Sequence, residues 1–117
     1  MQLESLVPGR LISGPNLNAD YARDETPLLF EQSPEAVALP GSTDEVSALL
    51  RFCNDKRIPV TPRGSGTGLV GGAVAACGGL VLSLENMNRI LEFDEKNLKV
   101  RVEPGVRIGD LQCACRD

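Results

Sequence analysis

The part of the sequence best suited to chemistry is a glycine-rich stretch, because seven of the 12 glycines lie between Gly64 and Gly79. From Lys56 to Leu84 there are three basic residues and no Asp or Glu, although the whole chain has a formal net charge of −4. Glycines lack a Cβ, so successive backbone N–H groups can form a concave nest around an anion. Arg63 can add a charge-assisted hydrogen bond. The pattern favours a phosphate-binding loop, and a set of purely structural tight turns is the alternative.

Two known phosphate loops can be compared with this stretch. A Walker A loop ends in Gly-Lys-Ser or Gly-Lys-Thr, whereas this loop ends in Gly-Gly-Ala. The dinucleotide fingerprint GxGxxG is present from Gly66, and Glu85 lies about where its ribose-binding acid would be. However, that fingerprint must open a crossover helix, and a crossover needs at least roughly 10–12 residues. The segment between Gly72 and Gly78 is too short, so a Rossmann fold is disfavoured.

The composition narrows the chemistry further. The 117 residues include no His, which excludes a His base, a His metal ligand and a Ser-His-Asp triad. The four Cys form no CxxC pair, and we expect them to be thiols in a reducing compartment, with no metal site. The net acidity argues against nucleic-acid binding. No apolar run approaches the roughly 18 residues of a membrane span. The sequence therefore predicts a cytoplasmic protein, either free or peripheral to a membrane.

A strand, a helix and a second strand are expected before the loop. The apolar run Ala36–Leu39 is closed by Pro-Gly, which is typical of a buried strand that ends in a turn. Ser42 is suited to cap the following helix, and Glu45 at the third helical position completes a capping box. Apolar residues then recur at helical spacing, at Val46, Leu49, Leu50 and Cys53. The cysteine of this stripe is expected to pack in the core. With a strand at Ile58–Thr61, the segment predicts a small βαβ unit with parallel strands.

Further strands are expected after the loop. Residues 79–84 predict one strand. Two runs with period-2 alternation, at Leu91–Phe93 and Leu98–Val102, predict a hairpin with Asn97 in a left-handed conformation at its turn. Residues 108–116 are expected to begin a helix.

These elements predict an α+β fold, in which a small parallel βαβ unit is followed by an antiparallel meander. Residues 1–35 contain several Pro and Gly breakers and are expected to form an arm with a short helix. Residues 36–117 are expected to form one domain, since a domain usually takes roughly 100–200 residues.

Several segments, taken in order, resemble the PCMH-type FAD-binding proteins, the family related to vanillyl-alcohol oxidase. Pro62–Ala73 resembles the loop that binds the FAD diphosphate in this family. Other stretches resemble its branch of FAD-linked 2-hydroxyacid dehydrogenases, which includes D-lactate dehydrogenases and the glycolate oxidase D subunit: Pro40–Val46, Ile58–Thr61, Met87–Leu91 and Val102–Val106. Tyr21–Thr26 looks like a short segment that these proteins carry ahead of the domain. The ordered combination is far more specific than any single glycine pattern.

The resemblance implies that the loop N–H groups hold the FAD diphosphate. The implied cofactor-binding residues are Arg63, Gly64, Ser65, Gly66, Thr67, Gly68, Leu69, Gly72, Pro104, Gly105 and Val106. Within this set Gly72 allows close approach, and the last three residues line the cofactor farther along. Some members link FAD covalently through a His, and this chain has none, so FAD is expected to be non-covalent. No catalytic residue can be assigned and no metal is implied.

The resemblance further implies a flavin-dependent oxidoreductase that acts on a small 2-hydroxy acid of the glycolate or D-lactate type. In such proteins a hydride passes from the substrate to the flavin, and the electrons leave to a quinone, an iron–sulfur partner or another acceptor subunit. The family continues well past Gln112, so we expect a truncated N-terminal part that is not catalytically competent alone. The alternatives are a non-catalytic small domain that binds another phosphate ligand or a protein partner, and an inert remnant.

Overall fold

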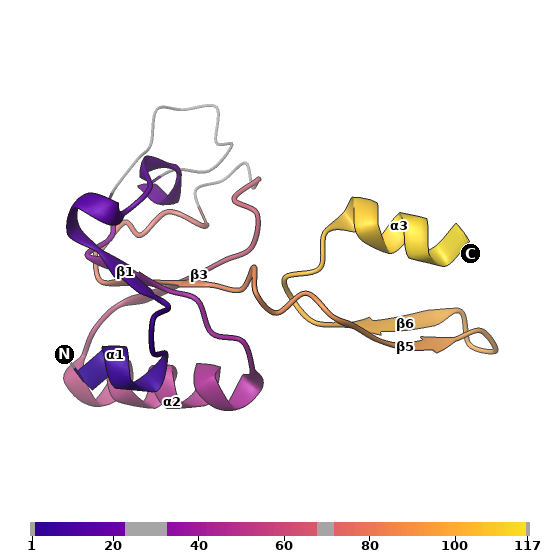
Figure 1. Cartoon of the computed structure of the whole chain (residues 1–117), viewed down its shortest axis with the longest axis horizontal. Coiled ribbons are helices and arrows are strands. Elements are labelled where there is room, and N and C mark those ends of the chain that lie inside the picture. Colours follow the sequence, from indigo (N-terminus) through magenta and orange to yellow (C-terminus); the bar gives the residue numbers. More distant parts are fainter. Residues whose placement is uncertain (1, 23–32, 68–71, 117) are drawn as a thin grey trace.

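The computed structural model describes residues 2–22, 33–67 and 72–116, and within them one four-stranded sheet and one two-stranded hairpin carry the fold (Figure 1). The larger sheet has the order β1-β2-β4-β3, with β1 antiparallel to β2, and with β2 and β3 both parallel to β4. The hairpin strands β5 and β6 are antiparallel. Parallel and antiparallel pairing in one chain confirms the predicted α+β class.

The elements follow one another along the described chain within these bounds. The strands are β1 (Leu11–Ser13), β2 (Ala36–Ala38), β3 (Val60–Arg63), β4 (Leu80–Ser83), β5 (Ile90–Asp94) and β6 (Lys99–Val102). The helices are α1 (Gln2–Leu6), α2 (Thr43–Lys56) and α3 (Ile108–Arg116), with 3-10 turns η1 (Gly14–Asn16) and η2 (Ala19–Ala22).

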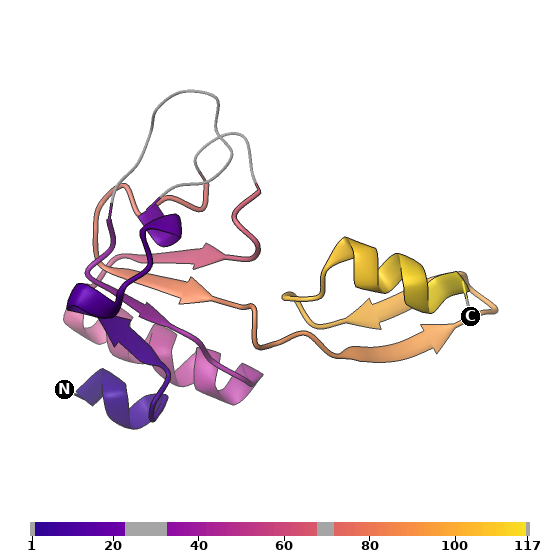
Figure 2. The same cartoon turned by 45° about the horizontal axis from the view of Figure 1, so that its top comes forward.

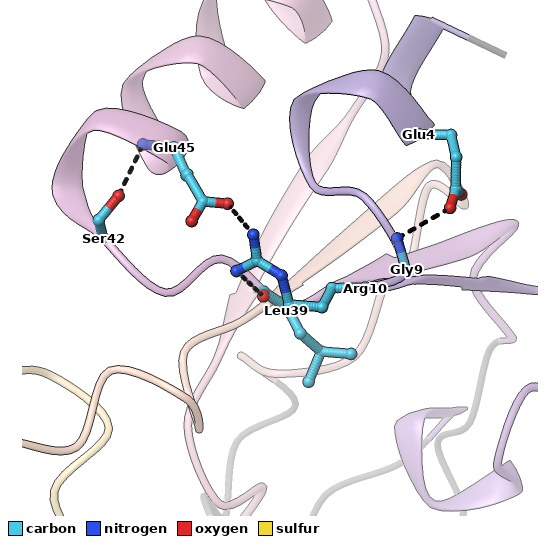
Figure 3. A network of polar contacts seen from close by, with 6 residues as sticks. All are labelled: Glu4, Gly9, Arg10, Leu39, Ser42 and Glu45. Atoms are coloured by element: carbon cyan, nitrogen blue, oxygen red, sulfur yellow. Dashed lines mark hydrogen bonds and ion pairs between the residues drawn. The ribbon is translucent and has the colours of Figure 1, made fainter.

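Helix α2 begins where the capping pattern predicts. The Ser42 hydroxyl accepts a hydrogen bond from the Glu45 N–H at 3.2 Å, which satisfies one of the N–H groups that a helix start leaves unpaired (Figure 3). The Glu45 carboxylate accepts from Arg10 Nη2 at 2.5 Å, and Arg10 also donates to the Leu39 carbonyl oxygen. Arg10 thereby fastens the start of α2 to the chain that enters β1. The helix ends at Lys56, and the residue that caps it, Arg57, has a left-handed φ of 56°.

The two faces of the larger sheet pack against different parts of the chain. One face carries α1 and α2, which lie side by side in Figures 1 and 2. Its buried residues are Leu3, Val7, Ala36, Ala38, Leu49, Cys53, Leu80 and Leu82. The cysteine of α2 is 1% exposed, which confirms its predicted place in the core. The opposite face places Val37 and Val81 against Ala75, Ile12, Leu17 and Tyr21, because alternate residues of a strand point to opposite faces.

The strand order differs from a simple βαβ unit. Strands β2 and β3 are parallel as predicted, but β4 lies between them. Strand β3 therefore has one partner among the described residues, and it extends through Pro62 to Arg63, past the expected end at Thr61. An edge position tolerates Pro62, which has no N–H to donate. The segment expected to be an arm supplies β1, a strand that no local sequence pattern predicts.

The hairpin of β5 and β6 forms where the period-2 runs predict it, but one expectation about its turn was wrong. Leu98, with φ of 54°, takes the left-handed conformation that was assigned to Asn97. The Asn97 backbone N–H and side-chain amide donate instead to the Asp94 carboxylate, which fixes the turn by side-chain hydrogen bonds. Helix α3 lies beside this hairpin in Figures 1 and 2 and has no buried residue.

Candidate cofactor-binding site

A hollow of about 550 Å³ lies at the carboxyl ends of β3 and β4. In open sheets with parallel strands, ligands bind outside these carboxyl ends. The lining comes from four segments: η2 and its approach (Asn18, Asp20, Tyr21), the end of β3 and the turn after it (Arg63, Gly64, Ser65), the turn after β4 (Glu85, Asn86, Asn88), and the first turn of α3 with its approach (Gly105, Arg107, Asp110). The structure thus brings four predicted residues, Arg63, Gly64, Ser65 and Gly105, to one place.

Residues 64–67 form the turn that opens after β3. Gly64, Ser65 and Thr67 are exposed, and Gly66 has a φ of 71°. The N–H groups of this turn donate to no acceptor within the described part of the chain. Exposed and unpaired N–H groups around a left-handed residue are the donors that form an anion-binding nest. The turn therefore fits the diphosphate group that the resemblance implies.

The Arg63 side chain is buried beside this turn and is 7% exposed. Its Nη2 donates to the Asp20 carbonyl oxygen at 2.8 Å, and its Nη1 donates to the Ala73 carbonyl oxygen at 3.3 Å. The guanidinium carbon lies 5.6 Å from the centroid of the Tyr21 ring, within range of a cation–π interaction. The guanidinium therefore joins segments that are far apart in the sequence.

Tyr21 connects the same region to the turn after β4. Its hydroxyl donates to Glu85 Oε1 at 2.6 Å. Burial of the ring and then the hydrogen bond and charge of the Glu85 carboxylate raise the pKa of Tyr21 to about 12, because each disfavours a phenolate. The phenol stays protonated and uncharged at neutral pH, so it adds no negative charge where an anion would bind.

Charge in the hollow is mixed, although the glycine-rich stretch itself contains no acid. Asp20, Glu85 and Asp110 bring carboxyl groups to the lining, and Arg63 and Arg107 bring guanidinium groups. The excess of basic residues between Lys56 and Leu84 is therefore a property of that segment and not of the folded site. A diphosphate bound here would depend on main-chain N–H dipoles more than on net positive charge.

Gly105 is a glycine for a packing reason as well as for its place in the lining. A Cβ built on it would lie 1.9 Å from the Leu84 carbonyl oxygen and 2.8 Å from that of Met87. Its N–H donates to the Met87 oxygen at 2.7 Å. The close approach holds the turn after β4 against the segment that leads to α3, and so shapes one side of the hollow.

The remaining predicted residues are spread more widely. Pro104 lines a separate apolar groove beside α2, and Val106 is half-buried. A Cβ built on Gly72 would meet no described atom within 4 Å. Gly68 and Leu69 lie outside the described residues.

Most of the lining was not among the predicted cofactor-binding residues. The missed residues are Asn18, Asp20, Tyr21, Glu85, Asn86, Asn88, Arg107 and Asp110. Asn86 and Asn88 could have been predicted, because they follow the parallel strand β4 and residues after parallel strands gather at the same sheet edge as the glycine-rich turn. The residues before η2 and at α3 reach the hollow only through tertiary packing.

Two further features concern membranes and metals. No helix among residues 2–22, 33–67 and 72–116 is long and apolar enough to cross a bilayer. The same residues contain no cluster of three or more His, Cys, Asp or Glu that could hold a metal ion.

Comparison with known proteins defines the class. A family model described as an FAD binding domain matches residues 34–117, and the chain belongs to this family. The fold agrees: p-cresol methylhydroxylase superposes with a TM-score of 0.82 at 22% identity, over 97% of this chain and 23% of that one. Alkyldihydroxyacetonephosphate synthase superposes with a TM-score of 0.84 at 16% identity, over 98% of this chain and 23% of the other.

Curated relatives place the chain more narrowly. It is 41% identical to a D-lactate dehydrogenase of Anaerostipes hadrus over 94% of this chain and 23% of the relative. It is 50% identical to glycolate oxidase subunit GlcD of Bacillus subtilis (strain 168), over 74% of this chain and 18% of that protein. These findings confirm the resemblance to FAD-linked 2-hydroxyacid oxidoreductases. The chain spans about a quarter of the length of the curated relatives that it matches.

Proposed function

We propose that this chain holds the diphosphate of a non-covalently bound FAD at the carboxyl ends of β3 and β4. The observation that carries this proposal is the turn of residues 64–67, whose first two residues line the hollow and whose N–H groups have no acceptor among the described residues. Gly64 and Ser65 line the hollow directly. The phosphate oxygens accept hydrogen bonds from these N–H groups, which are fixed by the strand that precedes them.

The cofactor links the chain to a reaction class. FAD supplies an acceptor for the two electrons and the hydrogen that leave the hydroxyl-bearing carbon of a substrate. Relatives named D-lactate dehydrogenase, glycolate oxidase subunit and D-2-hydroxyglutarate dehydrogenase all act, by their names, on 2-hydroxy acids. We therefore assign this chain to the FAD-holding part of an oxidoreductase for a small 2-hydroxy acid. One relative is named as a subunit, which supports a partner subunit for this chain, and we propose that this partner accepts the electrons.

The first experiment measures ligand choice with the chain itself. FAD, FMN and ADP are titrated separately, and both the melting temperature and, for the flavins, the fluorescence are followed. FAD is expected to bind more tightly than FMN, which lacks the diphosphate, and more tightly than ADP, which lacks the flavin. Tighter binding of ADP than of FAD would point to another nucleotide ligand, and no response to saturating FAD would overturn the proposal.

The second experiment tests the reaction class in a chimera. This chain replaces the corresponding part of the Bacillus subtilis subunit, and the purified protein is mixed anaerobically with glycolate or D-lactate. Bleaching of the flavin absorbance by either acid is expected, with the natural subunit as the positive control. A Gly66→Val chimera should lose the flavin, because the added side chain would collide with the Arg63 guanidinium and displace the turn. A folded chimera that retains FAD without bleaching would contradict the assigned class.

A further inference from the structure

Arg63 lies where three segments meet: the end of β3, the 3-10 turn η2 and the chain at Ala73. Its backbone ends β3, one guanidinium nitrogen donates to the carbonyl oxygen of Asp20 in η2, and the other donates to the carbonyl oxygen of Ala73 beyond the loop. The two acceptors lie 43 residues before and 10 residues after it in the sequence. The side chain is 7% exposed, so these bonds form away from bulk water.

The loop backbone closes directly over this guanidinium. A Cβ built on Gly66 would lie 2.0 Å from Arg63 Nη2 and 2.5 Å from Cζ, far inside contact distance. Gly66 also has a left-handed φ of 71°, so the turn passes over the guanidinium with no side chain between them. On another side the guanidinium carbon lies 5.6 Å from the centroid of the Tyr21 ring. The planar guanidinium of Arg63 thus supports the turn of residues 64–67, and the ring of Tyr21 lies close to it.

We infer that Arg63 is a positioning residue, which aims the N–H groups of residues 64–67 into the hollow and acts on the ligand through them. This inference rests on the proposed function for the identity of the ligand. A guanidinium has several donors in a rigid planar fork, so it can serve two carbonyl groups on separate segments and still lie flat under a backbone turn. A lysine keeps the charge but offers a compact, strongly hydrated ammonium that cannot reproduce this shape.

The test separates shape from charge. FAD affinity of the full chain is measured for Arg63→Lys and Arg63→Gln at low and at high ionic strength, with Arg51→Lys and Arg51→Gln on the exposed surface of α2 as matched controls. A positioning role predicts that both Arg63 variants bind about tenfold more weakly or worse, by similar factors and at both salt concentrations. A direct charge contact predicts a larger loss for Gln than for Lys and a gap that shrinks with salt, and that result would overturn the inference.

A second measurement does not depend on FAD. Amide hydrogen exchange and chemical shifts are recorded by NMR for the ligand-free chain and for Arg63→Lys. Faster exchange at residues 64–67, with shifts near Asp20 and Ala73 and unchanged signals from β2, is expected. Unaltered loop signals would overturn the positioning role even if FAD fails to bind the unmodified chain, an outcome that by itself removes only the proposed function.

If the Arg63 variants do not fold, Gly66→Ala decides the matter, because it keeps the arginine and displaces the turn from it. Its expected result is a loss of FAD affinity similar to that of Arg63→Lys, with the signals of β2 and β4 preserved. Wild-type affinity in this variant would show that the contact between the turn and the guanidinium does not position the donors.

Discussion

The hydroxyl of Tyr21 and the carboxylate of Glu85 lie 2.6 Å apart, although 64 residues separate them in the sequence. This bond ties η2 to the turn after β4. Both residues line the site, so the bond joins two of its walls.

The first prediction concerns the ionisation of Tyr21, the single tyrosine in a chain without Trp. Its pKa is raised from 10.0 to about 12, by burial first and by Glu85 second. A group with a raised pKa stabilises the fold fully below pH 10, and this contribution is lost as the pH rises from 10 to about 12. An ultraviolet titration should give a midpoint well above that of the urea-unfolded chain, with circular dichroism to verify folding.

The Glu85→Gln variant supplies the control for this titration. Its midpoint should fall below that of the unmodified chain, because the carboxylate charge is gone, and should stay above 10 because the ring is still buried. Identical midpoints for the two folded proteins would contradict a contribution from Glu85.

The second prediction concerns the cap of α2. Ser42→Ala removes the acceptor for the Glu45 N–H and should lower the free energy of unfolding by about 1 kcal/mol. Ser47 is exposed within the same helix, and Ser47→Ala should leave stability unchanged or slightly raised, since Ala is the better helix former. Urea denaturation of both variants measures the difference. Equal stability of Ser42→Ala and the unmodified chain would contradict the capping role of Ser42.

This cap illustrates which parts of the fold the sequence predicts. Ser42 and the helix that it begins are signalled by residues a few positions apart, and local patterns also indicated the strands β2, β3, β4, β5 and β6. Strand β1 lies in a segment whose Pro and Gly residues indicated an irregular arm, and its three residues show no pattern that would predict a strand. The insertion of β4 between β2 and β3 depends on tertiary pairing, which leaves no local trace.

The site divides in the same way. The glycines after β3 are conspicuous because each costs backbone entropy and needs a reason. Asp20 and Arg107 reach the hollow only when the chain folds, so no spacing rule reveals them. The positioning role that we infer for Arg63 could not be predicted from the sequence either. Its hydrogen-bond acceptors are main-chain carbonyl oxygens, which every residue possesses and which therefore give no sequence signal.

The third prediction concerns Arg10 and Glu45, whose side chains join at 2.5 Å. The hydrogen bond from Arg10 is the main cause that lowers the pKa of Glu45 below 4.5. A lowered pKa means that this contribution to stability is present above pH 4.5 and is lost as the pH falls through the folded-state value. Glu45→Gln should therefore be less stable than the unmodified chain at pH 7, with the difference fading in acid. Glu95→Gln, in the exposed turn between β5 and β6, is the matched control. If the stability difference between Glu45→Gln and the unmodified chain persisted unchanged at low pH, the ion pair would not be its source.

The fourth prediction compares two glycines near α3. Gly105→Ala forces a Cβ to within 1.9 Å of the Leu84 carbonyl oxygen, so the turn after β4 must move, and unfolding should become easier by on the order of 2 kcal/mol. Gly109 lies inside α3, where an added Cβ meets no described atom within 4 Å, and Gly109→Ala should stabilise the helix by about 0.5–1 kcal/mol. Urea denaturation of both variants measures whether each substitution lowers or raises the free energy of unfolding.

Because the Gly105 contact also shapes the hollow, a folded Gly105→Ala chain should bind FAD more weakly, whereas Gly109→Ala should match the unmodified chain. Equal stability and equal FAD affinity in the two variants would show that the close approach of Gly105 to Leu84 constrains neither the fold nor the site.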